Sequence, residues 1–252
     1  MLSTLHINEP GDVPSVEILS LDRPQKRNAM LPRMLKLLQQ HVERSQADAI
    51  VLTGNGPTFC AGFDLDACED DPAVLDDLLS MLSQAIEAMV AAPQPVVMAV
   101  QGAAIAGGCA LVGGASYVLG VDDVRFGYPV LAIGVSPAVS APTLAHRSGW
   151  ACARELLLNP ELISAHKALK LGLLNEVVPS SDSLVDRATG VARSLARPSP
   201  DARQHTAAWL HEIAQLDLQQ PAGLNASRSV VNTDEQRDML SAAVIARRNK
   251  QS

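Results

Sequence analysis

Glycine-rich stretches hold the residues of this chain that are best suited to chemistry. Residues 101–114 read Gln-Gly-Ala-Ala-Ile-Ala-Gly-Gly-Cys-Ala-Leu-Val-Gly-Gly and follow the apolar segment 96–100. This order predicts a strand that leads into a buried helix beginning near Gly107. The first N–H groups of a helix lack partners within the helix and carry partial positive charge, so they suit an oxygen atom that gains negative charge. Taken alone, the stretch favours a packed helix whose glycines only permit close contact.

Two further motifs change that interpretation. Residues 59–65 read Phe-Cys-Ala-Gly-Phe-Asp-Leu, just after the β-branched segment 49–54. Residues 23–30 read Arg-Pro-Gln-Lys-Arg-Asn-Ala-Met and hold the clearest group of positive charges in an acidic chain. With residues 101–114, these motifs resemble the enoyl-CoA hydratase/isomerase (crotonase) family, over a span from about Val13 to Pro179. Three motifs in order are far more specific than one glycine pattern.

The resemblance implies a site for an acyl-coenzyme A thioester. In that family two backbone N–H groups donate to the thioester oxygen as an enolate forms, and the matching residues are Phe63 and Gly107. The main chain of Ala61, Asp64 and Leu65 falls where the family holds the adenine end of coenzyme A. The ring of Phe63 replaces a smaller side chain that is common there, so we expect a narrower acyl pocket.

Lys26 and Arg27 are the candidates for binding the phosphates of coenzyme A, because charged side chains recognise phosphate oxygens. The alternative for both is an ordinary solvated surface charge. We expect no metal ion and no cofactor beyond the coenzyme A moiety of the substrate.

The chain departs from the family where acid–base chemistry is done. The two glutamates that handle protons in the family's hydratases are replaced by Ala110 and Val130. Neither side chain can move a proton. Asp66 and Tyr128 are the preferred substitutes, against the simpler interpretations of a solvated loop carboxylate and a half-buried tyrosine. Weaker candidates are Ser136, Ser140, His146 and Glu69.

Three functions therefore remain open. The first is an enoyl-CoA hydratase/isomerase-type enzyme, a lyase or isomerase of fatty acid metabolism, which stabilises a thioester enolate with an unidentified proton carrier. The second is different acyl-CoA chemistry on the same scaffold, such as thioester hydrolysis or decarboxylation. The third is a catalytically silent subunit that binds coenzyme A.

Strands alternate with helices before residue 180, and helices alone follow, which predicts an α/β fold with a helical appendix. The expected strands are 15–21, 49–53, 96–100, 117–121, 124–130 and 175–179. The expected helices are 31–42, 75–90, 150–158, 164–171, 184–195, 202–216 and 233–248. Residues 64–71 and 131–142 are expected to be loops. The resemblance makes the predicted fold more specific: it implies a spiral of strand-strand-helix turns over residues 1–179. It also implies that residues 180–252 form a C-terminal helical region through which the chain assembles as a homotrimer or hexamer.

Composition limits the partners. The chain has 252 residues and a net charge of −7 without a basic run, which argues against nucleic acid or a membrane surface as a partner. The start of the chain shows no secretory signal, so we expect a cytoplasmic protein. Its four cysteines have neither zinc-site nor Cys-x-x-Cys spacing. A nucleophilic role for Cys109, near a helix start, is a minor alternative to simple burial.

Overall fold

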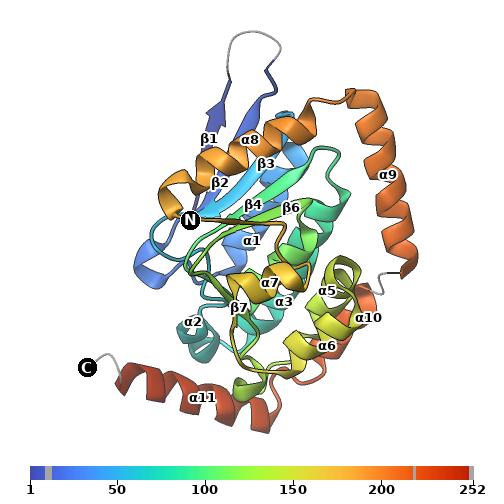
Figure 1. Ribbon diagram of the computed structural model, residues 1–252. Coiled ribbons are helices and arrows are strands. Elements are labelled where there is room, and N and C mark those ends of the chain that lie inside the picture. Colours follow the sequence, from blue (N-terminus) through green and yellow to red (C-terminus); the bar gives the residue numbers. More distant parts are fainter. Residues whose placement is uncertain (9–12, 218–219, 250–252) are drawn as a thin grey trace.

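A twisted sheet forms the centre of the molecule (Figure 1). The computed structural model describes residues 1–8, 13–217 and 220–249. In these residues the sheet has the strand order β1-β2-β3-β4-β6-β9, with β1 antiparallel to β2 and the other pairs parallel. Its strands are β1 (Leu2–Ile7), β2 (Val16–Leu21), β3 (Ala49–Gly54), β4 (Val96–Val100), β6 (Tyr117–Val121) and β9 (Glu176–Val178). Strands β3 and β4 are continuous runs of buried residues, as expected for parallel strands covered on both faces.

A second, smaller sheet lies beside the first. It consists of β5 (Ala103–Ile105), β7 (Arg125–Gly127) and β8 (Ile163–Ser164), in that order. The chain passes from β4 into β5, and from β6 into β7, so consecutive strands contribute to different sheets. A helical segment follows each of these strand pairs, which confirms the expected α/β spiral of strand-strand-helix turns.

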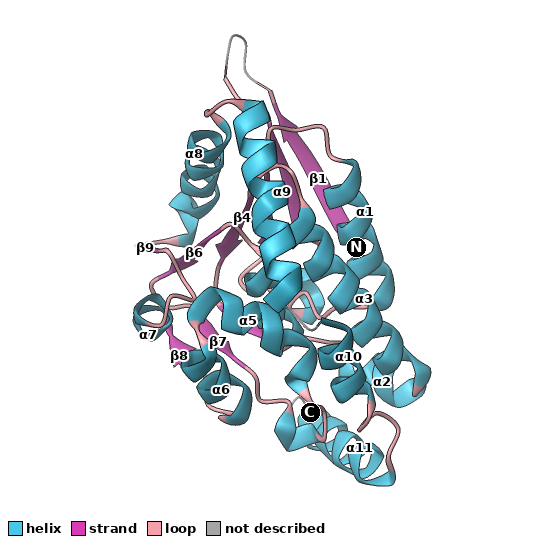
Figure 2. Cartoon of the chain, turned by 90° about the vertical axis from the view of Figure 1, so that its right-hand side faces the viewer, coloured by secondary structure: helices cyan, strands magenta, loops and turns pink. Residues whose placement is uncertain are grey.

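Helices cover both faces of the large sheet. Helix α8 (Leu184–Ala196) packs on β3 and β4, and helix α1 (Pro32–Arg44) lies on the opposite side, against α3 (Ala73–Ala91). The two views in Figures 1 and 2 agree on this layering. The apolar stripe of α1 is buried through Met34, Leu35, Leu38 and Val42.

The remaining helices include those of the C-terminal region. They are α2 (Leu65–Asp70), α4 (Gly107–Ala110), α5 (Ala141–Ser148), α6 (Trp150–Leu158), α7 (Ala165–Lys170), α9 (Pro200–Asp217), α10 (Gln220–Arg228) and α11 (Asp234–Asn249). Helix α10 packs on α3 and on the 3-10 turn Pro137–Ser140, and α11 packs on α2. The role of residues 180–252 in trimer formation stays a prediction.

Most predicted elements are confirmed, and the differences have local causes. The acidic segment 64–71 forms helix α2 instead of a loop, because Leu65 and Cys68, three residues apart, turn one side inward while Asp66, Glu69 and Asp70 keep contact with solvent. The segment 131–142 contains two 3-10 turns and the start of α5, and the strand expected over 124–130 is only β7. Strands β1, β5 and β8 and helices α5 and α10 were not predicted.

Candidate functional site

The segment 59–64 lies between two other parts of the chain and connects them. Cys60 pairs with Ala104 of β5, and Phe63 pairs with Met30, each as a parallel bridge. The sequence motifs around residues 30, 60 and 105 are therefore hydrogen-bonded neighbours. This pairing fixes the backbone of both glycine-bearing stretches before any ligand binds.

The N–H groups of Phe63 and Gly107 are the two donors expected from the sequence. Neither has a hydrogen-bond partner among the described residues. Gly107 is the first residue of α4, and the preceding Ala106 has φ 50° and ψ −112°. A positive φ is costly for alanine and persists only where the surroundings impose it. Here the Ala106 N–H donates to the Gly127 carbonyl at 2.8 Å, which holds the turn that starts the helix.

Close packing explains the glycine at 107. A Cβ atom there would lie 2.7 Å from Cε of Met30 and 2.8 Å from Cε1 of Phe63. At Gly108 it would lie 2.7 Å from Cβ of Cys60. The ring of Phe63 thus lies against the backbone that supplies the second donor, and a side chain on either glycine would push the two stretches apart.

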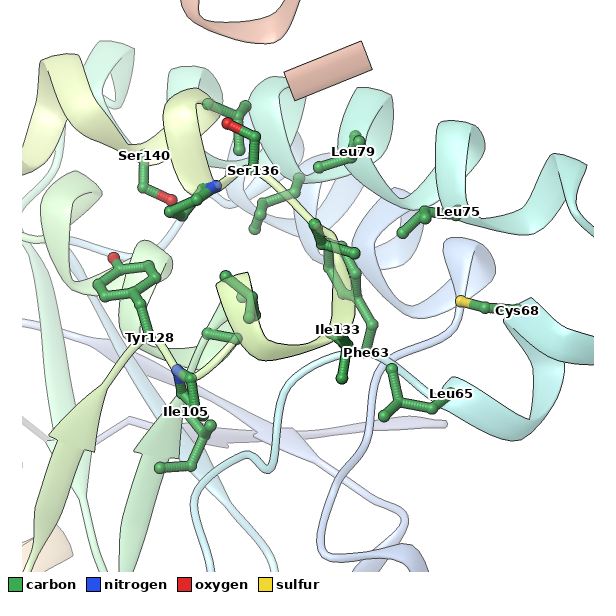
Figure 3. Close-up of a pocket in the computed structure, with 18 of the residues that line it drawn as sticks. Phe63, Leu65, Cys68, Leu75, Leu79, Ile105, Tyr128, Ile133, Ser136 and Ser140 are labelled. Atoms are coloured by element: carbon green, nitrogen blue, oxygen red, sulfur yellow. The ribbon is translucent and has the colours of Figure 1, made fainter. Parts of the chain in front are cut away.

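An apolar cavity of about 240 Å³ opens beside these donors (Figure 3). Phe63, Gly107 and Ala61 line it near the donors, and Leu75, Leu79 and Leu240 line it from α3 and α11. In the described part of the chain, none of the residues that line this cavity is Asp, Glu, His, Lys or Arg. Its polar side chains are Tyr128, Ser136, Ser140 and Cys68.

Tyr128 is the candidate acid that the structure brings to the cavity. Its side chain is buried, 1% exposed, and its hydroxyl has no hydrogen bond of ordinary geometry among the described residues. Ser140 and Cys109 are the polar groups beside it, and Figure 3 shows the Ser140 and Tyr128 side chains on the same side of the cavity. Burial raises the pKa of Tyr128 well above its usual range. The hydroxyl therefore stays protonated and suits donation of a proton instead of removal.

The two positions of the missing glutamates lie in different surroundings. Ala110 in α4 is buried, 1% exposed, and does not line the cavity. Val130 lines the cavity. The absence of a carboxylate from the lining follows directly from the Val130 side chain.

Asp66, the other candidate for proton transfer, lies outside this cavity lining. Its carboxylate accepts a hydrogen bond from Lys26 Nζ at 3.0 Å, and Arg248 Nη2 is 3.8 Å away. The bonded Lys26 ammonium group holds the pKa of Asp66 below its usual range. The carboxylate is thus a weak base on the exposed side of α2. Arg27, also exposed, has φ 50° and ends the turn that carries both cations.

The residues expected near the adenine end of coenzyme A separate into two groups. Ala61 and Leu65 line the cavity. Asp64 is buried and accepts a hydrogen bond from Arg23 Nη2 at 2.9 Å. Arg23 also donates to the Ala29 carbonyl at 2.6 Å, so this pair holds the basic turn against the start of α2.

The cysteines are buried thiols. Burial raises the pKa of Cys60, Cys68 and Cys109 to about 12. A nucleophilic role for Cys109 thus receives no support, because the thiolate is the reactive form.

In the part of the chain that the structure describes, no group of three or more His, Cys, Asp or Glu residues is arranged to hold a metal ion. Within the same residues, no helix is long and apolar enough to cross a membrane.

Sequence reasoning missed a serine that shapes the cavity from a distance. Ser227 of α10 is buried, and its Oγ donates to the Ser136 carbonyl at 2.9 Å and accepts from the Val139 N–H at 2.8 Å. It thereby holds the 3-10 turn that carries Ser136 and Ser140. No sequence motif marks this residue, because its partners lie about ninety residues earlier. His146 lines a different hollow, beside α3 and α9.

Comparisons with known proteins identify the family and the fold. The sequence model described as enoyl-CoA hydratase/isomerase matches residues 13–247. A 2,3-dehydroadipyl-CoA hydratase of Escherichia coli is 33% identical over 85% of each chain. Crystal structures of enoyl-CoA hydratase/isomerases from Mycobacterium paratuberculosis and Xanthobacter autotrophicus Py2 are each 25% identical, with a TM-score of 0.82. The first covers 95% of this chain and 97% of its own, and the second covers 98% and 97%. The chain belongs to the enoyl-CoA hydratase/isomerase (crotonase) family.

Proposed function

We propose that the chain binds a coenzyme A thioester, with the acyl group in the apolar cavity and the carbonyl oxygen on the N–H groups of Phe63 and Gly107. The observation that carries this proposal is that both N–H groups lack partners and lie at a cavity without a charged side chain in its described lining. Rigid backbone donors favour the enolate over the thioester, and one such donor is typically worth about 3 kcal/mol. Lys26 and Arg27 would hold the phosphates.

The same cavity disfavours hydration and proton abstraction. Water addition needs a group that removes a proton from water, and Val130 supplies none. The bacterial relative named for a dehydroadipyl thioester acts, by that name, on an acyl group with a second carboxylate. The far end of this cavity is apolar and does not suit a charge at the end of the acyl tail, so we do not transfer that substrate.

Decarboxylation of a thioester that carries a β-carboxylate is the reaction that the Tyr128 hydroxyl favours. The bond between the α-carbon and the carboxylate breaks, its electron pair forms the enolate, and carbon dioxide leaves. The hydroxyl then gives its proton to the α-carbon and regains one from solvent. No base is required. Tyr128 lines the cavity, and its buried, protonated hydroxyl is the nearest group that could supply the proton this sequence needs. A silent coenzyme A-binding subunit is the remaining candidate.

One experiment separates these functions. The protein is incubated in deuterium oxide with enoyl-, saturated and β-carboxyl acyl-CoA thioesters, and the products are followed by mass. We expect binding of the thioesters, no hydrated product, and loss of carbon dioxide with one deuterium gained at the α-carbon. Binding without any product supports the silent subunit. A hydrated product contradicts the assignment, and absence of binding contradicts the proposed function as a whole.

A further inference from the structure

A partition of three side chains closes the far end of the cavity. Cys68 of α2, Leu75 of α3 and Leu240 of α11 line the cavity, and the same three residues line a second hollow of about 150 Å³. All three are buried. The second hollow is polar, since Glu69 and Arg237 also line it. The partition therefore separates an apolar space from a charged one.

The position of Leu240 is fixed from both ends of α11. Near the start of the helix, a Cβ atom on Gly134 would lie 2.9 Å from Cα of Gln236, so the backbones are in close contact. Near its end, Arg248 Nη2 lies 3.1 Å from Glu69 Oε2 of α2. Val244, one turn after Leu240, is also buried, but it does not line the cavity. Leu240 is thus held as a wall and not as a mobile side chain at a helix end.

The size and lining of the cavity define the acyl group that fits. A water molecule occupies about 30 Å³ of the liquid. A methylene group is of similar size, so a cavity of about 240 Å³ takes an acyl group of roughly eight carbons. An apolar tail gains by burial here, whereas a terminal carboxylate would lose its water without finding a cation.

We propose that Cys68, Leu75 and Leu240 set the length and polarity of the acyl tail, so that the far end of the site takes apolar tails of up to about eight carbons and rejects tails that end in a carboxylate. This inference rests on the proposed binding of coenzyme A thioesters.

The test is calorimetric titration with saturated acyl-CoA thioesters of two to fourteen carbons, and with adipyl-CoA. We expect affinity to rise about threefold per added methylene and to stop rising near eight carbons. Adipyl-CoA should bind at least about tenfold more weakly than hexanoyl-CoA, because its far end is charged.

Two variants locate the limit. Leu240→Ala joins the two hollows, so the length at which affinity stops rising should increase by roughly three carbons, the size of the side chain lost. The matched control is Val244→Ala, which trims a buried residue of the same helix and should leave the limit where it was. Leu75→Ala tests the partition from α3 if Leu240→Ala does not fold, which circular dichroism reports.

The outcomes are distinguishable. Affinity that is independent of chain length, with acetyl-CoA still bound, overturns the partition and leaves the proposed function intact. The partition is also overturned if adipyl-CoA binds as tightly as hexanoyl-CoA. It is likewise overturned if Leu240→Ala and Val244→Ala change equally the chain length at which affinity stops rising. Failure of every thioester to bind overturns the proposed function itself.

Discussion

The ammonium group of Lys26 is bonded to the carboxylate of Asp66, with Nζ 3.0 Å from Oδ2. A cation expected to meet phosphate is therefore already paired in the free protein. Both side chains are partly exposed, so the pair is weak and a phosphate can compete for the lysine.

This pairing gives the first prediction. The double variant Lys26→Glu with Arg27→Glu should weaken thioester binding about tenfold at low salt and less at high salt, because screening reduces the attraction of phosphate. Asp66→Asn should strengthen binding a few-fold by releasing Lys26. Calorimetry at two salt concentrations measures both effects. The matched control is Arg154→Glu with Lys170→Glu, two exposed reversals on α6 and α7. If the control weakens binding as much, the effect is one of net charge only.

The second prediction concerns hydration. The native protein should hydrate a short enoyl-CoA very slowly, because each positioned acid or base typically contributes about a hundred- to ten-thousand-fold. Ala110→Glu with Val130→Glu should raise the rate, followed through the ultraviolet absorbance of the enoyl group. The gain should increase with pH, because a carboxyl group among apolar neighbours has a raised pKa and acts as a base only when ionised.

Val130→Gln in place of Val130→Glu is the control for that experiment, since it has a similar shape without the charge. Rapid hydration by the native protein would show that another side chain moves the proton. Tyr128→Phe would then be the first variant to examine, because Tyr128 lines the cavity and carries a buried hydroxyl.

A pair of glycine substitutions gives the third prediction. Gly107→Ala should lower the free energy of unfolding by about 1–3 kcal/mol and weaken thioester binding, because the new Cβ displaces the ends of Met30 and Phe63. Gly190→Ala in α8 has no heavy atom within 4 Å of the new Cβ and should stabilise the protein by about 0.5–1 kcal/mol. Urea unfolding measures both. Equal effects at the two sites would contradict the close packing described around Gly107.

The buried thiols predict a loss of stability in alkali. Cys60, Cys68 and Cys109 have a pKa of about 12 in the folded chain, raised by burial from the model-peptide value of 9.0. Above pH 9 the unfolded chain releases these protons while the folded chain keeps them, so stability is complete below pH 9 and falls as the pH rises toward 12. Each thiol should cost about 1 kcal/mol at pH 10. Urea unfolding at pH 8 and pH 10 checks this, and Cys109→Ala should reduce the fall.

The fifth prediction is the assembly. The side chains of Trp209 and Leu210 on α9 are each 58% exposed, and Trp150 and Leu158 on α6 are exposed as well. Large apolar side chains at such exposure are typical of surfaces that another chain covers. We expect light scattering at micromolar concentration to give three or six times the mass of one chain. Trp209→Glu should lower that mass, and a stable monomer of the native protein would refute the prediction.

The sequence was informative where structure depends on local patterns. The buried runs of β3 and β4 and the apolar stripe of α1 follow from periodicity alone, and the spiral and both backbone donors came from the three motifs. The strands that could not be predicted from the sequence form by pairing with segments far away in the chain. Strand β1 has an exposed face and forms only by pairing with β2. Strand β5, of three residues, exists because β7 and Cys60 pair with it.

Only some of the residues that form the cavity can be predicted from local sequence patterns. The Phe63 and Gly107 donors could be named from motifs, but its walls could not. Ser227 and Leu240 come from helices more than a hundred residues later than either donor, and nothing in their local sequence distinguishes them from ordinary buried residues. The acidic residues of α2 led to the prediction of a loop, because charge alone does not show that Cys68 faces inward.

The late position of Leu240 in the chain has a consequence during synthesis. A nascent chain that has emerged only as far as residue 200 contains every strand of both sheets and the two N–H donors. It lacks α10, which holds the Ser136 turn, and α11, which supplies the wall. In such a chain the apolar residues of α3 that line the cavity would not be covered by α11. The cavity therefore lacks one wall until Leu240 has been translated, and a premature stop before α11 would leave both sheets with an unfinished pocket.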